Sequence, residues 1–323
     1  MLVELAATAA LALPPTHYQR ARERLERWVS QERELPVQRG AESRVFLHPD
    51  TAPRGTLVMY HGFTAGTWQY EILGAQAFRQ GYNVFVPRMP GHGLKTATGD
   101  EDPSQLLRGT AWRQYQHFGD ETVALARDLG GPLSVLGLSV GGNVALDVAE
   151  RHADVERVVA YAPFLWPLHD RVGRLFGILN GLDAIFPGRA SSALDGITHS
   201  WGPECRAETL SGQRPGHSYF PASAAFAAAA YGLAIEEAAP RSRADLQVFI
   251  TAVDDAAQEA IIRRVHQRWG GRTRGLFRYG QAEAVPHPML HPREDRGRGH
   301  TPRLYQMTLD YLGTGLPLNR DVP

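Results

Sequence analysis

Residues 132–149 read PLSVLGLSVGGNVALDVA, and this stretch decides the fold of the chain. Leu133 to Leu138 form an apolar run typical of a buried strand, and beyond residue 142 apolar residues recur at helical spacing. Between the two lies Gly-x-Ser-x-Gly, residues 137–141. A turn this tight between strand and helix needs glycines on both sides, and the serine at its apex takes a strained conformation that exposes its hydroxyl. We therefore predict that Ser139 is a nucleophile, with a Gly- and Ser-rich turn without chemistry as the alternative.

The composition is that of a globular protein with a sizeable core. The 323 residues, 43% hydrophobic and 21% charged, suffice for one large α/β domain with an insertion or for two small domains. Lys+Arg and Asp+Glu balance at 34 each, so no overall field attracts nucleic acid or an anionic membrane. The single cysteine, Cys205, excludes an intramolecular disulfide and a multi-cysteine metal site. No apolar run approaches the roughly 18 residues of a membrane helix, so no integral membrane segment is expected.

The N-terminal stretch is the part of the sequence from which we predict the cellular location of the protein. Leu2 to Leu13 is apolar and Ala-rich, but no Lys or Arg precedes it. It therefore lacks the basic region that begins a signal peptide. We expect a cytoplasmic protein, with export as the alternative if the true start lies upstream.

Short apolar runs alternate with helical patterns along most of the chain, which predicts a mostly parallel sheet flanked by helices. The expected helices are an exposed amphipathic one at 17–34 and others at 68–80, 110–129, 256–269 and 302–312. The expected strands are 45–47, 55–60, 82–86, 133–138, 155–161, 246–251 and, as the final strand, 274–279.

The alternation stops at Ala162, and no clear buried strand follows until after Arg243. This part is rich in aromatic residues and alanine, and we interpret it as a largely helical insertion over the sheet. The predicted organisation is an N-terminal helical extension at 1–40, an α/β core at 41–162 and 244–323, and a helical cap at 163–243.

A serine hydroxyl is a poor nucleophile at neutral pH, so Ser139 needs a base and a carboxylate that orients the base. In open parallel sheets the catalytic groups gather at the carboxyl ends of the strands. Asp254 and Asp255 directly follow the strand expected at 246–251, and their distance from its end does not separate them. The alternative role for either is to cap the helix that begins near Ala256.

Three histidines follow the last expected strand: His287, His291 and His300. We choose His287 as the base because a short loop could return it over Ser139 and because prolines flank it and restrict its backbone. The resulting order of serine, aspartate and histidine is the order that such an elbow uses.

Acyl transfer also places negative charge on the former carbonyl oxygen, and two backbone N–H groups must point at it. Val140, the residue after the nucleophile, supplies one of them at the positive end of the helix. Phe63 supplies the other from the turn His61-Gly62-Phe63, where Gly62 allows close approach. An ordinary strand-to-helix turn is the alternative for these residues.

Four motifs together resemble the α/β-hydrolase fold, and more narrowly its carboxylesterase and monoacylglycerol-lipase-like branch, also called the serine aminopeptidase-like hydrolases. They are His61-Gly62-Phe63-Thr64, Gly81-Tyr82-Asn83-Val84, Pro90-Gly91-His92-Gly93 and Gly137-Leu138-Ser139-Val140-Gly141-Gly142. The resemblance covers the chain except for its first 40 residues or so. It implies an eight-stranded core with a helical cap between strands six and seven. In that family the Pro-Gly-His-Gly loop is a fold marker, which leaves His92 out of the mechanism.

Two features depart from the family pattern. The acid motif usually reads Gly-x-x-Asp, whereas the matching run here begins with Thr251. Its register favours Asp254 over Asp255. The histidine often follows Gly or Ser, whereas Pro286 precedes His287.

These residues predict a serine hydrolase that cleaves carboxylic esters of a small-molecule substrate through an acyl-enzyme on Ser139. The composition of the cap favours an apolar acyl or alcohol pocket, and the side chains expected to line it, or alternatively to belong to the core, are Trp68, Trp201, Tyr219 and Phe220. Nothing in this mechanism calls for a metal or an organic cofactor.

Two other functions are considered. An aminopeptidase or amidase would use the same triad, and a peptidase that grips a free amino terminus would need carboxylates in the cap, such as Glu204, Glu208, Glu236 or Glu237. A non-catalytic binding protein that keeps the fold is the remaining alternative.

Overall fold

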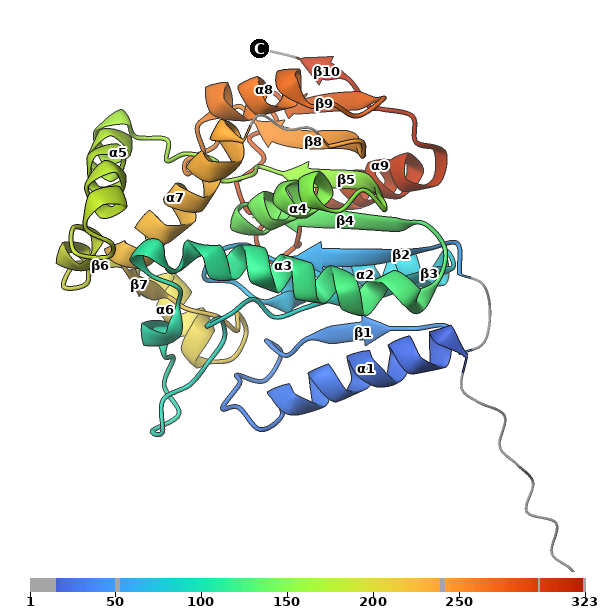
Figure 1. The fold of residues 1–323 in the computed structure, drawn as a ribbon, viewed down its shortest axis with the longest axis horizontal. Coiled ribbons are helices and arrows are strands. Elements are labelled where there is room, and N and C mark those ends of the chain that lie inside the picture. Colours follow the sequence, from blue (N-terminus) through green and yellow to red (C-terminus); the bar gives the residue numbers. More distant parts are fainter. Residues whose placement is uncertain (1–15, 50–52, 239–241, 296, 322–323) are drawn as a thin grey trace, which may run out of the picture.

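A twisted sheet forms the centre of the molecule (Figure 1). The computed structural model describes residues 16–49, 53–238, 242–295 and 297–321. In this part of the chain the sheet has eight strands in the order β1-β3-β2-β4-β5-β8-β9-β10. Every neighbouring pair is parallel except β1 with β3. The strands are β1 (Arg44–Phe46), β2 (Gly55–Tyr60), β3 (Tyr82–Val86), β4 (Leu133–Leu138), β5 (Val155–Tyr161), β8 (Asp245–Thr251), β9 (Arg274–Tyr279) and β10 (Arg320–Asp321).

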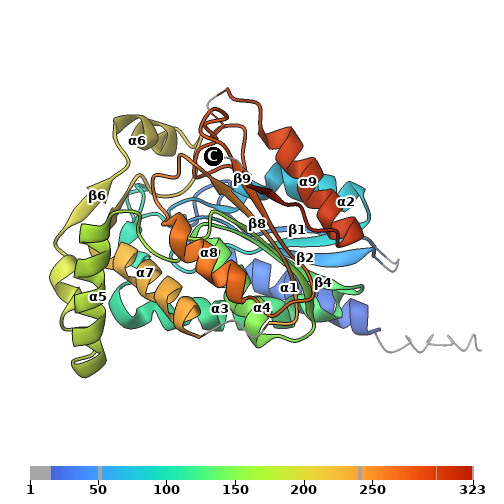
Figure 2. The same cartoon turned by 90° about the horizontal axis from the view of Figure 1, so that it is seen from above.

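Helices cover both faces of this sheet (Figure 2). Side chains alternate along each buried strand, so that Val58 and Tyr60 of β2 pack under one helix layer and Leu57 and Met59 under the other. One layer contains α1 (His17–Glu32), α3 (Arg113–Ala126), α4 (Val140–Arg151) and α8 (Glu259–Arg268), and the other contains α2 (Glu71–Arg79) and α9 (Thr301–Thr314). This is the α/β architecture that the sequence predicts.

The strand count matches the expectation, but the position of the insertion within the sheet does not. Residues 163–243, which we call the cap segment, follow the fifth strand of this sheet and not the sixth. The eighth strand is β10, at the C-terminal end, so the prediction that 274–279 is the final strand is wrong. β10 has two residues and shows no apolar pattern, which is why the sequence places it in a tail.

Helix α1 is less exposed than its composition predicts. Ala21 and Leu25 are fully buried against the core, and Glu32 forms a buried ion pair with Arg88 at 3.0 Å. The apolar stretch Leu2–Leu13, on which the expected location depends, lies outside the described residues. Among the described helices, none combines the length and the hydropathy that a bilayer crossing requires.

In its described residues the cap segment contains three α-helices, a 3-10 helix at Ser191–Leu194 and a small two-stranded antiparallel sheet: α5 (Asp170–Ile185), β6 (Thr198–Ser200), α6 (Pro203–Leu210), β7 (Tyr219–Pro221) and α7 (Ala222–Glu237). The sequence does not predict this small sheet, because β6 is exposed and carries no apolar run. Helix α7 packs into the molecule with most of its side chains buried. Helix α5 stands at the periphery (Figure 1). It exposes several large apolar side chains.

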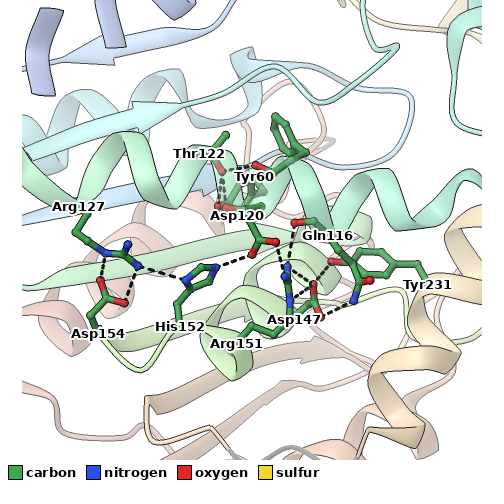
Figure 3. Close-up of polar contacts among 12 residues, drawn as sticks. Tyr60, Gln116, Asp120, Thr122, Arg127, Asp147, Arg151, His152, Asp154 and Tyr231 are labelled. Atoms are coloured by element: carbon green, nitrogen blue, oxygen red, sulfur yellow. Dashed lines mark hydrogen bonds and ion pairs between the residues drawn. The ribbon is translucent and has the colours of Figure 1, made fainter. Parts of the chain in front are cut away.

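Polar contacts hold α4, the helix after the predicted nucleophile, between α3 and α7 (Figure 3). The buried carboxylate of Asp147 on α4 accepts hydrogen bonds from Tyr231 of α7 at 3.0 Å and from Gln116 of α3 at 3.2 Å. Arg151 pairs with the same carboxylate at 2.9 Å and also with Asp120 of α3. One part of the cap segment is therefore attached directly to the helix that follows Ser139.

Candidate active site

Ser139 lies in the strained turn that its sequence predicts. It joins β4 to α4 with φ +56°, a left-handed value that non-glycine residues rarely adopt. A Cβ at Gly137 would lie 1.9 Å from the carbonyl oxygen of Gly141, and one at Gly141 would lie 2.2 Å from that of Tyr60. Only glycine therefore fits on either side of the serine. Ser139 is 7% exposed.

The structure distinguishes the two candidate acids. After β8, the carboxylate of Asp254 lies against the imidazole of His287, with Oδ2 2.9 Å and Oδ1 3.0 Å from Nδ1. Asp254 Oδ1 also accepts the N–H groups of Ala256 and Ala257, at 2.9 and 2.7 Å. Asp254 is therefore the candidate acid that contacts His287, whereas Asp255 is exposed. The alternative role as a helix cap is not observed for Asp254, because the next helix, α8, begins at Glu259 with Gln258 as its N-cap.

The pair is poised as an ionised carboxylate beside a basic imidazole. Burial by itself lowers the pKa of His287, but the charge of Asp254 and the hydrogen bond to it outweigh burial, and the pKa lies above its usual value. Burial raises the pKa of Asp254, but the charge of His287 and the two amide hydrogen bonds oppose this, and the pKa lies below its usual value. Asp254 therefore orients His287 and stabilises its protonated form.

The other two histidines of this region have different partners. His291 lies against Glu71, and its Nδ1 accepts the Arg293 N–H. His300 hydrogen-bonds the carbonyl of Met289 and contacts Asp295. Neither contacts Asp254 within the described residues.

Ser139 and His287 share one edge of the sheet, because both follow the carboxyl ends of parallel strands. In the described structure no hydrogen bond joins the Ser139 hydroxyl to His287. Catalytic hydrogen bonds of this kind are often long without substrate and tighten when it binds. The Asp254–His287 pair and the strained Ser139 therefore lie at the same edge of the sheet, but no described hydrogen bond joins Ser139 to His287.

Two backbone N–H groups near Ser139 are available as donors. Among the described residues neither the Phe63 N–H nor the Val140 N–H has a hydrogen-bond acceptor. Val140 is the first residue of α4, where an N–H group has no partner within the helix and the helix dipole is positive. These are the two amides that the sequence predicts to bind an oxyanion.

The imidazole of His61 holds the peptide that carries the Phe63 N–H. His61 Nε2 accepts the Met89 N–H at 3.0 Å, so the ring proton lies on Nδ1 and is donated to the Gly62 carbonyl at 2.9 Å. A trans peptide is planar, so fixing the Gly62 C=O also fixes the opposite direction of the Phe63 N–H. Burial lowers the pKa of His61 to about 4, which keeps the ring neutral.

The four predicted lining residues lie in different surroundings. Trp68 is 1% exposed and donates its indole N–H to the Pro215 carbonyl at 2.7 Å, which favours a structural role. Phe220 is buried with its ring 5.0 Å from that of Phe63 and 5.2 Å from that of Trp201. Trp201 is 47% exposed. Tyr219 is partly buried at the start of β7.

Several polar side chains support these loops through contacts that the sequence does not predict. The Thr251 hydroxyl donates to the Val285 carbonyl at 2.6 Å, which ties the loop of Asp254 to that of His287. Gln69 accepts the Gly62 N–H at 2.8 Å and donates to Glu294 at 2.9 Å. Only Thr251 carried a signal in the sequence, because it stands where the family pattern has glycine.

Next to the Asp254–His287 pair lies a cavity of about 280 Å³, lined by the residues Val253, Asp255, Ala284, Pro286, His287, Pro288 and Arg298. In the described part of the chain no three His, Cys, Asp or Glu side chains are grouped as metal ligands would be.

Known proteins resemble this chain in sequence and in structure. A thermostable monoacylglycerol lipase of Bacillus sp. (strain H-257) is 30% identical over 126 residues, which are 39% of this chain and 46% of that protein. The match thus spans less than half the length of that relative. The Paleococcus ferrophilus monoacylglycerol lipase superposes with a TM-score of 0.62 at 17% identity, over 85% of this chain and 98% of that one. A carboxyl esterase of Bacillus coagulans superposes with a TM-score of 0.55 at 14% identity, over 84% and 93%.

At these identities the superpositions establish the fold, and it is that of the α/β-hydrolases. The model of the serine aminopeptidase S33 family (Hydrolase_4) matches residues 51–282, which is more than half of the chain and includes the Ser139 turn and the Asp254 loop. The chain belongs to the serine aminopeptidase S33 family.

Proposed function

We propose that this protein hydrolyses carboxylic esters through an acyl-enzyme on Ser139. The observation that carries the proposal is the Asp254–His287 pair, which lies at the same sheet edge as a strained serine and two amides that have no acceptor within the described part of the chain. Each of these parts has a definite role in acyl transfer.

In the first half-reaction, His287 takes the proton of the Ser139 hydroxyl as the oxygen attacks the ester carbonyl. The Phe63 and Val140 amides stabilise the oxyanion of the tetrahedral intermediate, and Asp254 stabilises the imidazolium that has formed. The intermediate collapses, the bond to the alcohol breaks, and His287 gives its proton to the leaving oxygen. Water then attacks the acyl-enzyme with His287 again as base, which releases the acid and restores Ser139.

The aromatic residues beside the oxyanion turn and the apolar surface of the cap segment support a substrate class. Phe63, Phe220 and Trp201 form an aromatic group beside the oxyanion turn. Large exposed apolar side chains are also concentrated in the cap segment, among them Leu175, Ile178 and Ile185. We therefore propose an ester with an apolar acyl or alcohol group, and the names of the lipase and esterase relatives agree with this choice.

The aminopeptidase alternative has weaker support. Glu236 is paired with Arg264 at 3.1 Å, and the remaining candidate carboxylates, Glu204, Glu208 and Glu237, are exposed. None of the four contacts Ser139, His287 or the oxyanion turn within the described residues.

Turnover of p-nitrophenyl esters of graded chain length, compared with that of aminoacyl-anilides, tests this function. We expect hydrolysis of the esters, with kcat/KM rising with acyl length, and at least a 10⁴-fold lower kcat in Ser139→Ala. Faster cleavage of the anilides would favour the peptidase, and equal turnover by wild type and Ser139→Ala would contradict a serine mechanism.

A further inference from the structure

The oxyanion turn His61–Thr64 is in contact with the cap segment. Thr64 has φ +60°, a strained value for a β-branched residue, so its conformation depends on the surrounding contacts. The Trp201 indole N–H donates to the Thr64 hydroxyl at 2.8 Å, and the His217 N–H donates to the Thr64 carbonyl at 2.7 Å. Both donors belong to the cap segment.

The part of the cap that reaches the turn, residues 214–218, is itself fastened to the core. Gly216 exchanges two hydrogen bonds with the side chain of Gln38, at 2.8 and 2.9 Å. The Pro215 carbonyl accepts the indole N–H of Trp68, and the Ser218 N–H donates to the buried carboxylate of Glu101. We call residues 214–218 the strap. Because core side chains hold it at several points, the strap can hold the turn in place.

A chain of three side chains, the partly exposed Arg214 and the buried Glu294 and Gln69, leads from the strap to the backbone of the turn. Arg214 donates to Glu294 Oε1 at 2.9 Å, and the amide of Gln69 donates to Glu294 Oε2 at 2.9 Å. The carbonyl oxygen of the same Gln69 amide accepts the Gly62 N–H at 2.8 Å. The chain therefore runs from the cap through Glu294 to the residue before Phe63.

Donor and acceptor roles fix each member of this chain. Only a carboxylate accepts from Arg214 and Gln69 at the same time, one donor on each oxygen. Because the NH₂ group of Gln69 points at that carboxylate, its carbonyl oxygen must face the Gly62 N–H. Without Glu294 the amide is free to flip and place NH₂ against that N–H. Burial raises the pKa of Glu294 above its usual value, and the charge of Arg214 and the hydrogen bonds from Gln69 and Arg214 offset only part of this rise.

We propose that Arg214, Glu294 and Gln69 form a relay through which the cap positions the oxyanion turn, so that the oxyanion hole is complete only when the strap is in place. The proposal rests on the function proposed above. Together with His61, the relay holds Gly62 on both sides: Gln69 fixes its N–H and His61 fixes its C=O. The three relay residues are positioning residues, since they act on the oxyanion through the Phe63 N–H.

The test uses Arg214→Gln, Glu294→Gln and the conservative variant Arg214→Lys. Arg206→Gln, an equal charge change at an exposed position of α6, is the matched control. Each protein is titrated with a fluorophosphonate so that rates refer to folded active sites. Ester kcat and KM are measured together with the inhibition constant of an alkyl trifluoromethyl ketone, whose serine adduct carries an oxyanion.

We expect kcat to fall at least about tenfold in Arg214→Gln and Glu294→Gln, with KM within about twofold. Complete loss of one oxyanion donor typically lowers kcat by about 10²- to 10³-fold. The effect here should be smaller, because breaking the relay displaces the Phe63 N–H without removing it. The affinity of these two variants for the ketone should fall in parallel with kcat/KM. Arg214→Lys should recover part of the loss, and Arg206→Gln should resemble wild type. If Glu294→Gln does not fold, the partly exposed Arg214 position decides the outcome.

An unchanged kcat in Arg214→Gln, or a loss in kcat without a matching loss of ketone affinity, would overturn the relay. An equal loss in Arg206→Gln would also overturn it. A wild-type chain that neither reacts with the fluorophosphonate nor hydrolyses esters would instead contradict the proposed function.

Discussion

On one side of Ser139, Asp254 and His287 are supported by the loops that follow β8 and β9. The Asp254 carboxylate is held by two amides of its own loop, and the Thr251 hydroxyl links that loop to Val285, two residues before His287. On the other side, the oxyanion turn is held by His61 of the core and by Trp201, His217 and Arg214 of the cap segment, the last acting through Glu294 and Gln69.

The difference separates two functions of one site. Proton transfer depends on contacts within the core, so changes in the cap should leave it intact. Oxyanion binding depends on contacts that cross between core and cap, so a displaced strap should lower the rate while the Asp254–His287 pair remains formed. Variants of the Asp254–His287 pair should therefore lose proton transfer, whereas variants of the strap and the relay should lose oxyanion binding.

The largest effect is expected at Asp254. Asparagine keeps the shape but presents a neutral amide to Nδ1, which destabilises the imidazolium and allows the wrong tautomer. We expect Asp254→Asn to lower kcat by about 10³- to 10⁴-fold. Asp255→Asn is the matched control, since Asp255 is exposed, and its kcat should stay within a few fold. The reverse ranking, measured on one ester at saturation, would assign the acid to Asp255.

The pH dependence of kcat/KM sharpens the comparison. Catalysis needs neutral His287, and its pKa is raised, so activity should rise with pH through a midpoint above the ordinary value of about 6.5. Asp254→Asn removes the charge that raises this pKa most, so the midpoint should move to lower pH. Glu294→Gln should lower the plateau and move the midpoint less, because Glu294 has a smaller influence on the pKa. A larger shift in Glu294→Gln than in Asp254→Asn would contradict the separation of the two sides.

A smaller effect is expected at Thr251, which is buried and stands where the family pattern has glycine. Thr251→Val keeps the shape but leaves the buried Val285 carbonyl without its donor. We expect a loss of about 1–3 kcal/mol in the free energy of unfolding, measured with urea, and a several-fold lower kcat. Thr251→Ser keeps the hydroxyl and should recover most of both. If Thr251→Val is as stable and active as wild type, the hydrogen bond has no role in joining the two loops.

The smallest effect is expected where α7 meets α4. Tyr231→Phe removes one donor to Asp147 and should cost about 1 kcal/mol of unfolding free energy with kcat within twofold, since Arg151 and Gln116 still hold the carboxylate.

Tyr115 offers a matched control: it is buried, it stacks on Tyr231 at 5.5 Å, and its hydroxyl has no partner among the described residues. Tyr115→Phe should be neutral or stabilising. An equal loss from both variants would mean that the Tyr231 hydrogen bond contributes nothing specific.

Local signals explain which parts of the molecule the sequence could predict. The Ser139 turn combines an apolar run, two required glycines and a helical period within 18 residues, and the Asp254 loop directly follows a strand. The short strands β6 and β10 were missed because they bury few residues and leave no period.

The supports of the oxyanion turn could not be predicted for a different reason. Gln69 and Glu294 are 225 residues apart in the chain, and Arg214 and Glu294 are 80 apart. No spacing rule connects such positions, and a lone Gln, Glu or Arg in a polar stretch reads as a solvated side chain. Only the fold shows that Glu294 is buried between two donors.

The most direct test of the central claim is to locate the residue that a fluorophosphonate modifies, by peptide mass spectrometry on wild type, Ser139→Ala and Asp254→Asn. We predict one adduct in wild type, on the peptide that contains Ser139, no adduct in Ser139→Ala, and the same adduct formed much more slowly in Asp254→Asn. An adduct on another residue, or undiminished labelling of Ser139→Ala, would contradict the account.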